Sequence, residues 1–566
     1  MNKHHTIFCV FLLFGSVFIS LCVSAEIAEP AGFRNGIVVT DSDIASDIGL
    51  RILQKGGTAV DAAVAVAFAL AVVFPQAGNI GGGGFMLVRN HNGDVTAIDY
   101  RETAPSGARN NMYLDTAGNV KEKMSEKGAL AAGVPGTVAG LHLAWKKHGT
   151  LPWKELLMPA IQLADKGFPV NKELADDLSE YRDDLSEYSS TAKIFFDSSQ
   201  NTLKEGSLLV QKELAQTLSL IAEKGPDAFY KGTIAKKLTA AMKKDGGIIT
   251  MADLKNYKPI TRNALSFGYK DYKIYSMGLP SSGGILLYII LKTLEEEPLA
   301  EYEHNSPAYI HLLVEIFKRA YAERAQHLGD PAFYEVPLEQ LLSNDFINTI
   351  RKVINKEKPT PSDEIAPTQF NNKEKLHTTH FSIVDKHGNA VANTYTLNDT
   401  FGSSYIAGDT GILMNNEMDD FSIKPGHPNM YGLIGSAANA IEPGKRMLSS
   451  MTPTIIEKNG VLYAVLGSPG GSRIITSVLQ VTLNLIEFRM PVSKAVSVPR
   501  FHHQWLPDIL YLEESFDTGI VTALKDMAYS IENKRIGCVN AVIYDSERKM
   551  YYGASDPRKM GKTSGY

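Results

Sequence analysis

The run from Ala59 to Phe74 (AVDAAVAVAFALAVVF) is the feature that most limits how this chain can fold. A helix of these residues is apolar on nearly every side, so it must be buried in the protein or in a membrane. Asp61 interrupts the run, and the uncharged remainder falls short of the about 20 apolar residues that span a bilayer. We therefore predict a closely packed internal helix. The chain has 566 residues, 44% of them hydrophobic, which is ample for a surrounding core.

Four consecutive glycines, Gly81 to Gly84, follow that run and lead into the apolar segment Phe85 to Val88. Glycines before a helix can form a phosphate-binding loop, but no Gly-Lys-Ser/Thr follows here and the next element is a predicted strand. A close approach of the backbone at a helix-to-strand turn is the favoured role, because glycine leaves room for it.

The first 25 residues have the layout of a secretory signal peptide. Basic residues precede an apolar run from Ile7 to Val23, and small residues around Ala25 suit cleavage after that position. A permanent membrane anchor is the alternative, and attachment of a lipid to Cys22 is disfavoured by the bulky residue before it. We expect residues 1–25 to be removed and the protein to be periplasmic or secreted, without a membrane anchor. Cys538 is then the one cysteine left, so an internal disulfide is excluded.

Charge and periodicity organise the rest of the chain. Lys and Arg number 57 against 62 Asp and Glu, and this slightly negative balance argues against nucleic-acid binding. About Leu130 to Asn355 has largely helical periodicity, and Lys356 to Lys375 is polar and proline-bearing, as in a mobile linker. From His377 onward the pattern is typical of strands. The predicted strands are Thr379–Val384, Ala390–Thr396, Ile412–Asn415, Val461–Gly467 and Ala541–Tyr544.

Two of these strands flank a turn cluster centred on His387, which predicts a hairpin. If the turn is centred there, Thr378 lies opposite Thr396, with the two side chains about 5 Å apart on one face. A threonine pair of this kind is common on sheet surfaces, and that alternative stays open from spacing alone. The polar segment that ends just before Thr378 favours a functional pair instead.

From about Asn35 to Tyr566 the chain resembles the gamma-glutamyltranspeptidases, especially the bacterial periplasmic ones, which belong to the N-terminal-nucleophile hydrolase superfamily. The matching stretches are GNIGGGGFMLV, DYRETAP, TTHFSIVDKHGNAVANTYTLN, NNEMDDFS, KRMLSSMTPT, LGSPGGSRIITSVLQ and PRFHHQWLPD. The resemblance implies an αββα sandwich made as one precursor that cuts itself between His377 and Thr378. It thus implies a large subunit of residues 26–377 and a small subunit of residues 378–566, joined as a heterodimer. Many bacterial relatives carry Gln where this chain has His377.

The resemblance assigns Thr378 as the nucleophile and Thr396 as the second threonine that hydrogen-bonds it. A threonine hydroxyl is a weak nucleophile and needs a base. Cleavage would free the α-amino group of Thr378, whose reference pKa of about 7.7–8.0 suits it to accept a proton near neutral pH. The backbone N–H groups of Gly470 and Gly471 match the oxyanion hole. Without the resemblance, Pro-Gly-Gly here fits a plain turn.

Recognition of the γ-glutamyl head group is likewise implied by the resemblance. A guanidinium suits a carboxylate because it can bond both oxygens. In isolation, Asp419-Asp420 also fits a solvated turn or helix cap. The matched residues are Arg101 with Ser449 and Ser450 for the α-carboxylate, Asp420 with Glu417 and Asn398 for the α-ammonium, and Tyr431, which latches a lid at Pro425–Ser436 to Asn398.

The implied activity is a two-step acyl transfer. Thr378 takes the γ-glutamyl group from glutathione or a related donor, and water, an amino acid or a dipeptide then accepts it. Two alternatives stay open: a cephalosporin or glutaryl acylase of the same superfamily, and an uncleaved binding protein on an inactive version of the fold. His502-His503 lacks further ligands at metal spacing, and we expect no metal and no cofactor.

Overall fold

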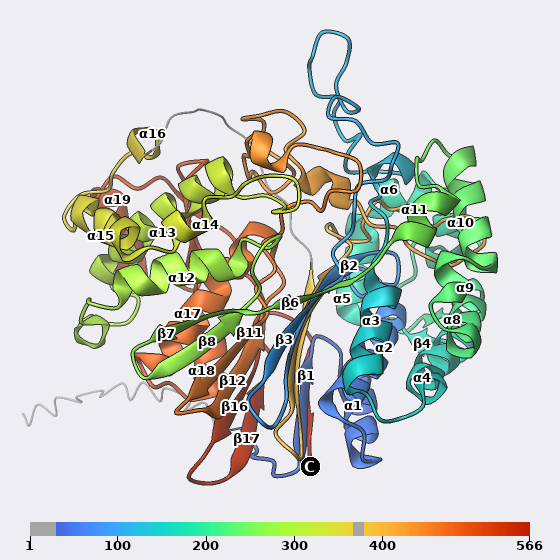
Figure 1. Cartoon of the computed structure of the whole chain (residues 1–566), viewed down its shortest axis with the longest axis horizontal. Helices are drawn as coiled ribbons and strands as arrows, with labels where there is room; N and C mark the ends of the chain where they lie inside the picture. Colours follow the sequence, from blue (N-terminus) through green and yellow to red (C-terminus); the bar gives the residue numbers. More distant parts are fainter. Residues whose placement is uncertain (1–29, 366–377) are drawn as a thin grey trace, which may run out of the picture.

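The computed structural model describes residues 30–365 and 378–566. Within these ranges two antiparallel sheets stack face to face, with helices on the outer side of each (Figure 1). This is the αββα sandwich that the resemblance implies. The seven-stranded sheet has the order β18 (Lys562–Gly565), β1 (Gly36–Thr40), β9 (Thr379–Asp385), β10 (Ala390–Thr396), β2 (Gly83–Arg89), β3 (Val95–Asp99) and β6 (Ile260–Asn263). The six-stranded sheet has the order β17 (Met550–Ala554), β16 (Asn540–Asp545), β12 (Val461–Gly467), β11 (Thr454–Lys458), β8 (Tyr272–Ser276) and β7 (Leu265–Tyr269).

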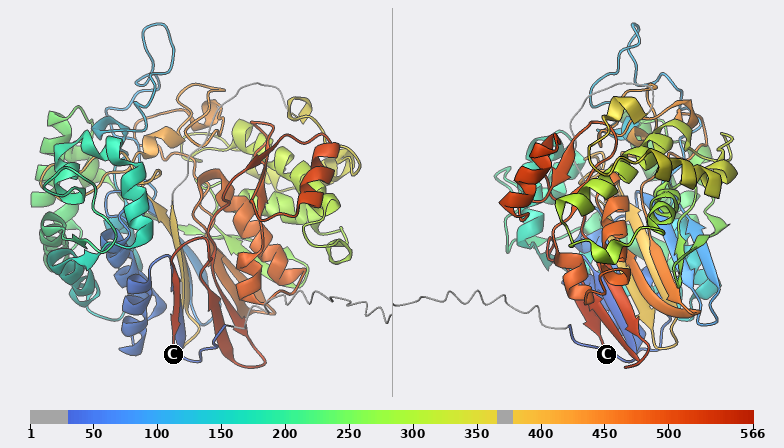
Figure 2. Two further views of the ribbon diagram at one scale, coloured as in Figure 1. Left: turned by 180° about the vertical axis from the view of Figure 1, so that it is seen from behind. Right: turned by 90° about the vertical axis from the view of Figure 1, so that its left-hand side faces the viewer.

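The helices divide between the two sides of the sandwich, as the views in Figure 2 also show. On the side of the seven-stranded sheet are α1 (Asp43–Gln54), α2 (Ala59–Val73), α3 (Thr137–His148), α4 (Trp153–Lys166), α5 (Lys172–Glu180), α6 (Arg182–Ser186), α7 (Ser189–Phe195), α8 (Lys212–Lys224), α9 (Asp227–Tyr230), α10 (Thr233–Lys244) and α11 (Met251–Asn256). On the other side are α12 (Gly283–Leu294), α13 (Pro307–His327), α14 (Leu338–Leu341), α15 (Asn344–Val353), α16 (Ser362–Ile365), α17 (Ile474–Ile486), α18 (Val492–Ser497) and α19 (Thr518–Asp526).

Short elements complete the described part of the chain. They are the strands β4 (Phe168–Pro169), β5 (Leu208–Leu209), β13 (Phe501–His502), β14 (Leu510–Leu512) and β15 (Ile531–Asn533), and the 3-10 helices η1 (Ala129–Ala131), η2 (Leu299–Glu301), η3 (Glu417–Asp420), η4 (Ala437–Asn439) and η5 (Gly471–Arg473).

The seven-stranded sheet is apolar on both faces because each face packs against another layer. Successive side chains of a strand point to opposite faces. In β1, Ile37 and Val39 belong to the core between the sheets, whereas Val38 packs with the helices on the outer side. In β9, Ile383 and Val384 divide in the same way. Strands buried on both faces read as continuous apolar runs.

The predicted internal helix is confirmed. Every residue of α2 is buried, and it packs against α1, α4 and the strands β9 and β10. Asp61 and Thr58 form a capping box at the start of the helix: the Asp61 carboxylate accepts the Thr58 N–H, while the Thr58 hydroxyl accepts the Asp61 N–H. The Asp61 carboxylate also accepts from the N–H of Thr150, and these hydrogen bonds offset the cost of burying its charge. Across the described ranges, no helix combines the length and the apolarity that a membrane span requires.

Three expectations about secondary structure need correction. Ile412–Asn415 is not a strand, because Leu413 makes only an isolated bridge with Ile406. The stretch Leu130–Asn355 is largely helical, yet it also supplies β6, β7 and β8. The first part of the predicted mobile linker is fixed: the Thr360 hydroxyl donates to the Glu315 carboxylate at 2.6 Å, and Ser362 is buried.

Several predicted features lie outside the described residues. They are the signal peptide at residues 1–25, the linker from residue 366 to 375, and the residue before the predicted cut, His377.

Candidate active site

The hairpin of β9 and β10 has the register that the turn spacing predicts. Tyr395 pairs with Thr379, so the next step of the same register sets Thr396 opposite Thr378. The two threonine Oγ atoms are 3.3 Å apart, and both residues are buried. The prediction that these two side chains meet is confirmed.

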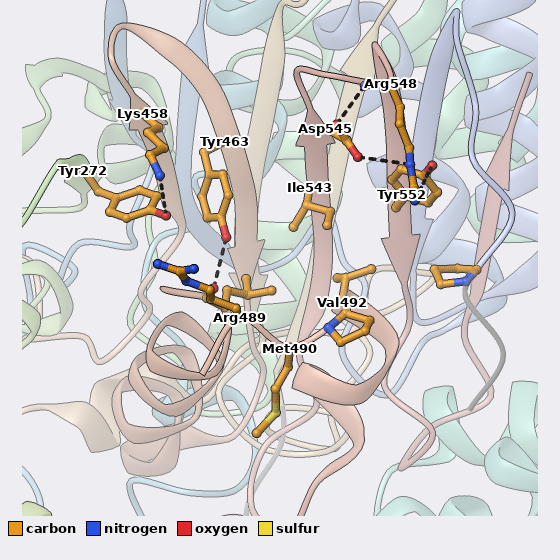
Figure 3. A pocket seen from close by; sticks show the side chains of 13 residues that line it. Tyr272, Lys458, Tyr463, Arg489, Met490, Val492, Ile543, Asp545, Arg548 and Tyr552 are labelled. Atoms are coloured by element: carbon orange, nitrogen blue, oxygen red, sulfur yellow. Dashed lines mark hydrogen bonds and ion pairs between the residues drawn. The ribbon is translucent and has the colours of Figure 1, made fainter. Parts of the chain in front are cut away.

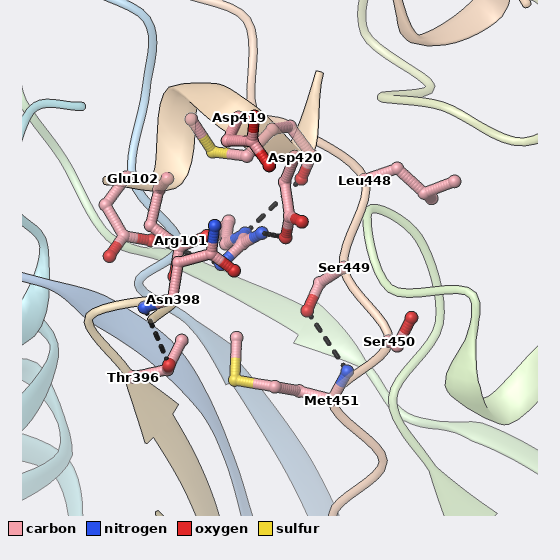
Figure 4. Close-up of polar contacts among 12 residues, drawn as sticks. Arg101, Glu102, Thr396, Asn398, Asp419, Asp420, Leu448, Ser449, Ser450 and Met451 are labelled. Atoms are coloured by element: carbon pink, nitrogen blue, oxygen red, sulfur yellow. Dashed lines mark hydrogen bonds and ion pairs between the residues drawn. The ribbon is translucent and has the colours of Figure 1, made fainter. Parts of the chain in front are cut away.

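The loop after β10 fixes the second threonine from the other side. The Asn398 N–H donates to the Thr396 Oγ at 2.8 Å (Figure 4). Asn398 has a φ of 82°, which places its backbone in the left-handed region that non-glycine residues seldom adopt. Strained backbone of this kind persists only where the surroundings hold it, and it clusters at functional sites.

The four glycines Gly81–Gly84 let other backbone segments reach the site. A Cβ on Gly82 would collide with the carbonyl oxygen of Thr396, and one on Gly81 with the carbonyl of Leu413. The close backbone approach predicted for this stretch is therefore confirmed. The turn between α2 and β2 therefore packs directly against the end of β10.

Thr378 borders a cavity of about 100 Å³. Its other lining residues are Pro469, Gly470, Arg535, Gly537, Cys538 and Lys559. Gly470 and Gly471 have φ values of 133° and 54°, conformations that suit glycine. Among the described residues, no acceptor takes a hydrogen bond from the N–H of either glycine. Gly470 lines the cavity together with Thr378, and Gly471 follows it in the chain. Free backbone donors close to a hydroxyl are what an oxyanion hole requires.

A histidine near the nucleophile is not available as its base. His380 is fully buried, between the hydroxyls of Thr394 and Ser382 at 2.8 and 3.1 Å. Burial lowers the pKa of His380 to about 3, so this imidazole is neutral at physiological pH. With both ring nitrogens engaged inside the sheet, it serves the packing.

Arg101 is the charged centre of the site. Its side chain follows β3, is fully buried, and lies 2.5 Å from carboxylate oxygens of both Glu417 and Asp420, which η3 presents (Figure 4). Glu102 is 3.5 Å away. The Arg101 Nε also donates to the Met447 carbonyl at 3.3 Å. The predicted carboxylate-binding residue and the predicted ammonium acceptors thus contact one another.

Burial and charge oppose each other in this cluster. Burial acts against the charge on Arg101, but the carboxylates of Glu417, Asp420 and Glu102 outweigh it, and the pKa of Arg101 is raised. Burial also raises the pKa values of Glu102, Glu417 and Asp420, while Arg101 opposes that shift. The cluster therefore holds extra protons more readily than exposed carboxylates do.

Ser449 and Ser450 lie in the loop before β11, below Asp420 in the view of Figure 4. Both are buried. The Ser449 Oγ accepts the Met451 N–H at 3.1 Å, and the Ser450 Oγ accepts from Arg324 at 3.3 Å.

The segment Pro425–Ser436 closes over the charged cluster. The Tyr431 hydroxyl donates to the Asn398 carbonyl at 2.5 Å, which is the contact that the resemblance implies. The Asn429 side chain donates to Asp420 at 3.1 Å, and the Met430 N–H donates to Asp419 at 2.8 Å. Asp419 and Asp420 hence face different partners.

A separate hollow of about 500 Å³ lies at the opposite end of the six-stranded sheet (Figure 3). Tyr463, near the start of β12, lines it, whereas Gly470 follows the end of that strand. Its polar side chains include Tyr272, Lys458 and Arg548, and it holds no threonine, serine or cysteine. It is separate from the Thr378 site, with which it shares no lining residue.

The sequence interpretation missed three residues of the site. Glu102 had a signal, because it directly follows Arg101 in the DYRETAP stretch. Asn429 lies within the predicted lid without any mark of its own. Arg324 belongs to an ordinary amphipathic pattern. Only the packing of α13 against the loop that carries Ser449 and Ser450 brings it to the site.

Comparisons with known proteins agree with this geometry. The model of the Gamma-glutamyltranspeptidase family matches residues 45–566. The glutathione hydrolase proenzyme of Escherichia coli is 47% identical over 550 residues, covering 97% of this chain and 95% of that protein. That of Pseudomonas aeruginosa is 45% identical over 554 residues, covering 96% and 97%. Among solved structures, a cephalosporin acylase from Bacillus halodurans has a TM-score of 0.85 at 26% identity and covers 98% of this chain and 99% of that one. A Helicobacter pylori gamma-glutamyltranspeptidase has a TM-score of 0.57 at 43% identity and covers 59% and 96%.

Proposed function

The chain belongs to the gamma-glutamyltranspeptidase family, and from that premise we propose how its own residues carry the reaction. It is a gamma-glutamyltransferase and glutathione hydrolase. We assign Thr378 as the nucleophile. The observation that carries this assignment is the 3.3 Å contact between the Thr378 and Thr396 hydroxyls, at a cavity that Gly470 also lines. The N–H groups of Gly470 and Gly471 have no acceptor within the part of the chain that the structure describes.

The nucleophile is proposed to arise by self-cleavage between His377 and Thr378. The Thr378 Oγ attacks the carbonyl of His377, and hydrolysis of the resulting ester frees the α-amino group of Thr378. That amine, with a reference pKa of about 7.7–8.0, then accepts the hydroxyl proton in each turnover. The buried position of Thr378 at the head of β9 supports the assignment, because the new chain end stays fixed beside Thr396.

The products of that cut, residues 26–377 and 378–566, would stay joined as a heterodimer. Both sheets interleave the two parts: β1 lies between β18 and β9, and β8 pairs with β11. Separating them would expose strand edges and the core between the sheets, which is costly.

Acyl transfer follows in two steps. The Thr378 Oγ bonds to the γ-carbonyl carbon of the donor, and the negative charge that develops on the carbonyl oxygen is taken by the Gly470 and Gly471 N–H groups. The C–N bond then breaks, and the leaving amine takes the proton held by the α-amino group. Water, or the amine of an amino acid or dipeptide, attacks the γ-glutamyl ester and restores Thr378.

The head group of the donor is proposed to bind at the Arg101 cluster. Arg101, Ser449 and Ser450 would bind the α-carboxylate, and Asp420 with Glu417 and Asn398 would bind the α-ammonium. All of these residues are buried except Asp420, whose side chain is 11% exposed. This low exposure supports strong recognition, since charge-assisted hydrogen bonds strengthen when water is excluded. The Tyr431 lid would shield the bound head group from solvent.

Export is also part of the proposal. The basic start, the apolar run and the small residues near Ala25 support a cleaved signal peptide and a periplasmic or secreted enzyme. No metal or cofactor is assigned a role.

An acylase activity has one point in its favour, the fold similarity to the cephalosporin acylase over 98% of the chain. The 26% identity of that relative is well below the 47% of the Escherichia coli glutathione hydrolase proenzyme, so γ-glutamyl donors are preferred. Rates on glutaryl-7-aminocephalosporanic acid and on glutathione compare the two directly.

The proposal is tested on the purified protein and its Thr378→Ala variant. Wild type should run as two chains on a denaturing gel, with the smaller beginning at Thr378 by N-terminal sequencing, and should release p-nitroaniline from γ-glutamyl-p-nitroanilide. Added glycylglycine should yield the γ-glutamyl tripeptide. Thr378→Ala should stay one chain and be inactive. A small chain that begins at any other residue would overturn the assignment.

A further inference from the structure

Arg324 of α13 is a buried arginine that contacts the loop carrying Ser449 and Ser450. It is 6% exposed, and no carboxylate of the described residues lies within 4.0 Å of its nitrogens. Its Nε donates to the Ser282 Oγ at 3.0 Å, and its terminal nitrogen donates to the Ser450 Oγ at 3.3 Å. Arg101 is paired with carboxylates at 2.5 Å, so the two arginines differ in their partners.

The hydrogen bond from Arg324 orients the hydroxyl of Ser450. A hydroxyl can donate one hydrogen bond and accept two. The Ser450 Oγ accepts from Arg324, and the Ser449 Oγ accepts from the Met451 N–H at 3.1 Å. Among the described residues, neither O–H has an acceptor of its own. Both serines therefore keep a free donor, and an anion is the partner that two such donors suit.

The electrostatic environment of Arg324 also favours the binding of an anion. Burial lowers the pKa of Arg324, with Asp420 opposing that shift and Arg101 adding to it. Tyr321, the other titratable neighbour, donates its hydroxyl to the Ser472 carbonyl. A buried cation without a counterion is costly, and an arriving carboxylate would compensate it.

We propose that Arg324 is a positioning residue for the α-carboxylate of the γ-glutamyl donor, acting through the oriented hydroxyl of Ser450 and through its own uncompensated charge. This inference rests on the proposed function, because it concerns the same head group. It makes carboxylate selectivity depend on two arginines: Arg101, which contacts the carboxylate directly, and Arg324, which orients the serine hydroxyl that contacts it.

The test compares γ-glutamyl-p-nitroanilide with 4-aminobutanoyl-p-nitroanilide, which has the same chain and amino group but lacks the α-carboxylate. Arg324→Met should raise KM for the first donor roughly tenfold to a hundredfold and change kcat by less than about threefold, because the residue acts on binding. The kcat/KM for the second donor should stay within about threefold of wild type. The preference between the donors should therefore collapse.

Two further comparisons separate this role from a structural one. Arg319→Met removes another buried arginine from α13, one that pairs with Glu315 at 2.8 Å, and should keep the wild-type preference. Ser450→Ala combined with Arg324→Met should cost less than the product of the two single losses, because both changes remove the route through the Ser450 hydroxyl. Arg324→Lys, which keeps the charge, should give an intermediate KM, and it carries the test if the methionine variant does not fold.

The outcomes separate this inference from the proposed function. If wild type neither cleaves itself nor prefers the γ-glutamyl donor, the proposed function fails. If wild type does both, and Arg324→Met or Arg324→Lys keeps the full preference for the donor with a carboxylate, the role of Arg324 alone is overturned. Additive effects of the Ser450 and Arg324 changes would also overturn the route through Ser450.

Discussion

Asp420→Asn is the sharpest test of the ammonium site, because it removes a charge and keeps the shape. One Asp420 oxygen lies 2.5 Å from Arg101, and the other accepts from Asn429 at 3.1 Å. The side chain is 11% exposed, so the charge is only weakly screened. If Asp420 binds the α-ammonium, the lost charge-assisted bond is worth about 1.5–3 kcal/mol. That predicts a loss of roughly tenfold to a hundredfold in kcat/KM.

The assay uses γ-glutamyl-p-nitroanilide and glutaryl-p-nitroanilide, which lacks the α-amino group. Wild type should strongly prefer the first, and Asp420→Asn should lose most of that preference. Self-cleavage needs Thr378 and its neighbours, so the variant should still yield two chains. Asp419→Asn is the matched control: that carboxylate faces Ser125 at 2.7 Å and the Met430 N–H, so the donor preference should persist.

Two results would refute this reasoning. If Asp420→Asn retains the full preference, the residue is only a partner of Arg101 and the ammonium binds elsewhere. Equal losses on both donors would show that Asp420 acts by holding Arg101 in place, since the glutaryl donor keeps a terminal carboxylate.

Three other changes test the surroundings of the site. Tyr431→Phe removes the bond to the Asn398 carbonyl, worth about 1 kcal/mol, so limited proteolysis within the lid should become about fivefold faster; an unchanged rate would contradict the latch. Burial raises the pKa of Asp419 to about 7, so its stabilising contribution is present below pH 4 and is lost as the pH rises through 7, by up to about 1.4 kcal/mol per pH unit. Thermal melts should therefore show the Tm of wild type falling relative to Asp419→Asn between pH 4 and 7, and parallel curves would exclude the shift. Gly82→Ala meets a carbonyl of β10 and should abolish soluble, cleaved protein, whereas Gly107→Ala, whose added Cβ lies 3.6 Å from its nearest neighbour, should not.

Features set by local chemistry could be predicted from the sequence. The apolar run of α2 required burial whatever surrounded it, and the turn at His387 set the register that brings Thr378 to Thr396. The four glycines signalled close backbone contact before any partner was known. In each case the information lies within about 20 residues, where spacing and side-chain size decide the outcome.

Features set by packing across the fold could not be predicted in this way. Ile412–Asn415 is apolar enough for a strand, yet among the described residues it pairs only through the bridge between Leu413 and Ile406. Polar composition suggested mobility around Thr360, but Glu315, a buried residue of α13, holds that segment. Arg324 carries no motif at all. Its environment comes from a loop more than 120 residues away in the chain, which no local pattern encodes.

The pairing of Arg101 with Glu417 and Asp420 gives a reason why a zwitterionic head group would suit the proposed pocket. Arg101 already has protein carboxylates as partners, so if the α-carboxylate binds at Arg101 as proposed, it must take the place of one of them. A donor that brings an ammonium supplies the displaced Asp420 with a new cation, and the pocket exchanges ion pairs without gaining net charge. A glutaryl donor brings only the anion, and leaves a buried carboxylate unpaired or forces it to take a proton. Under the proposed assignment, selectivity for the α-amino acid would therefore follow from the mutual pairing of Arg101 and Asp420, more than from either contact alone.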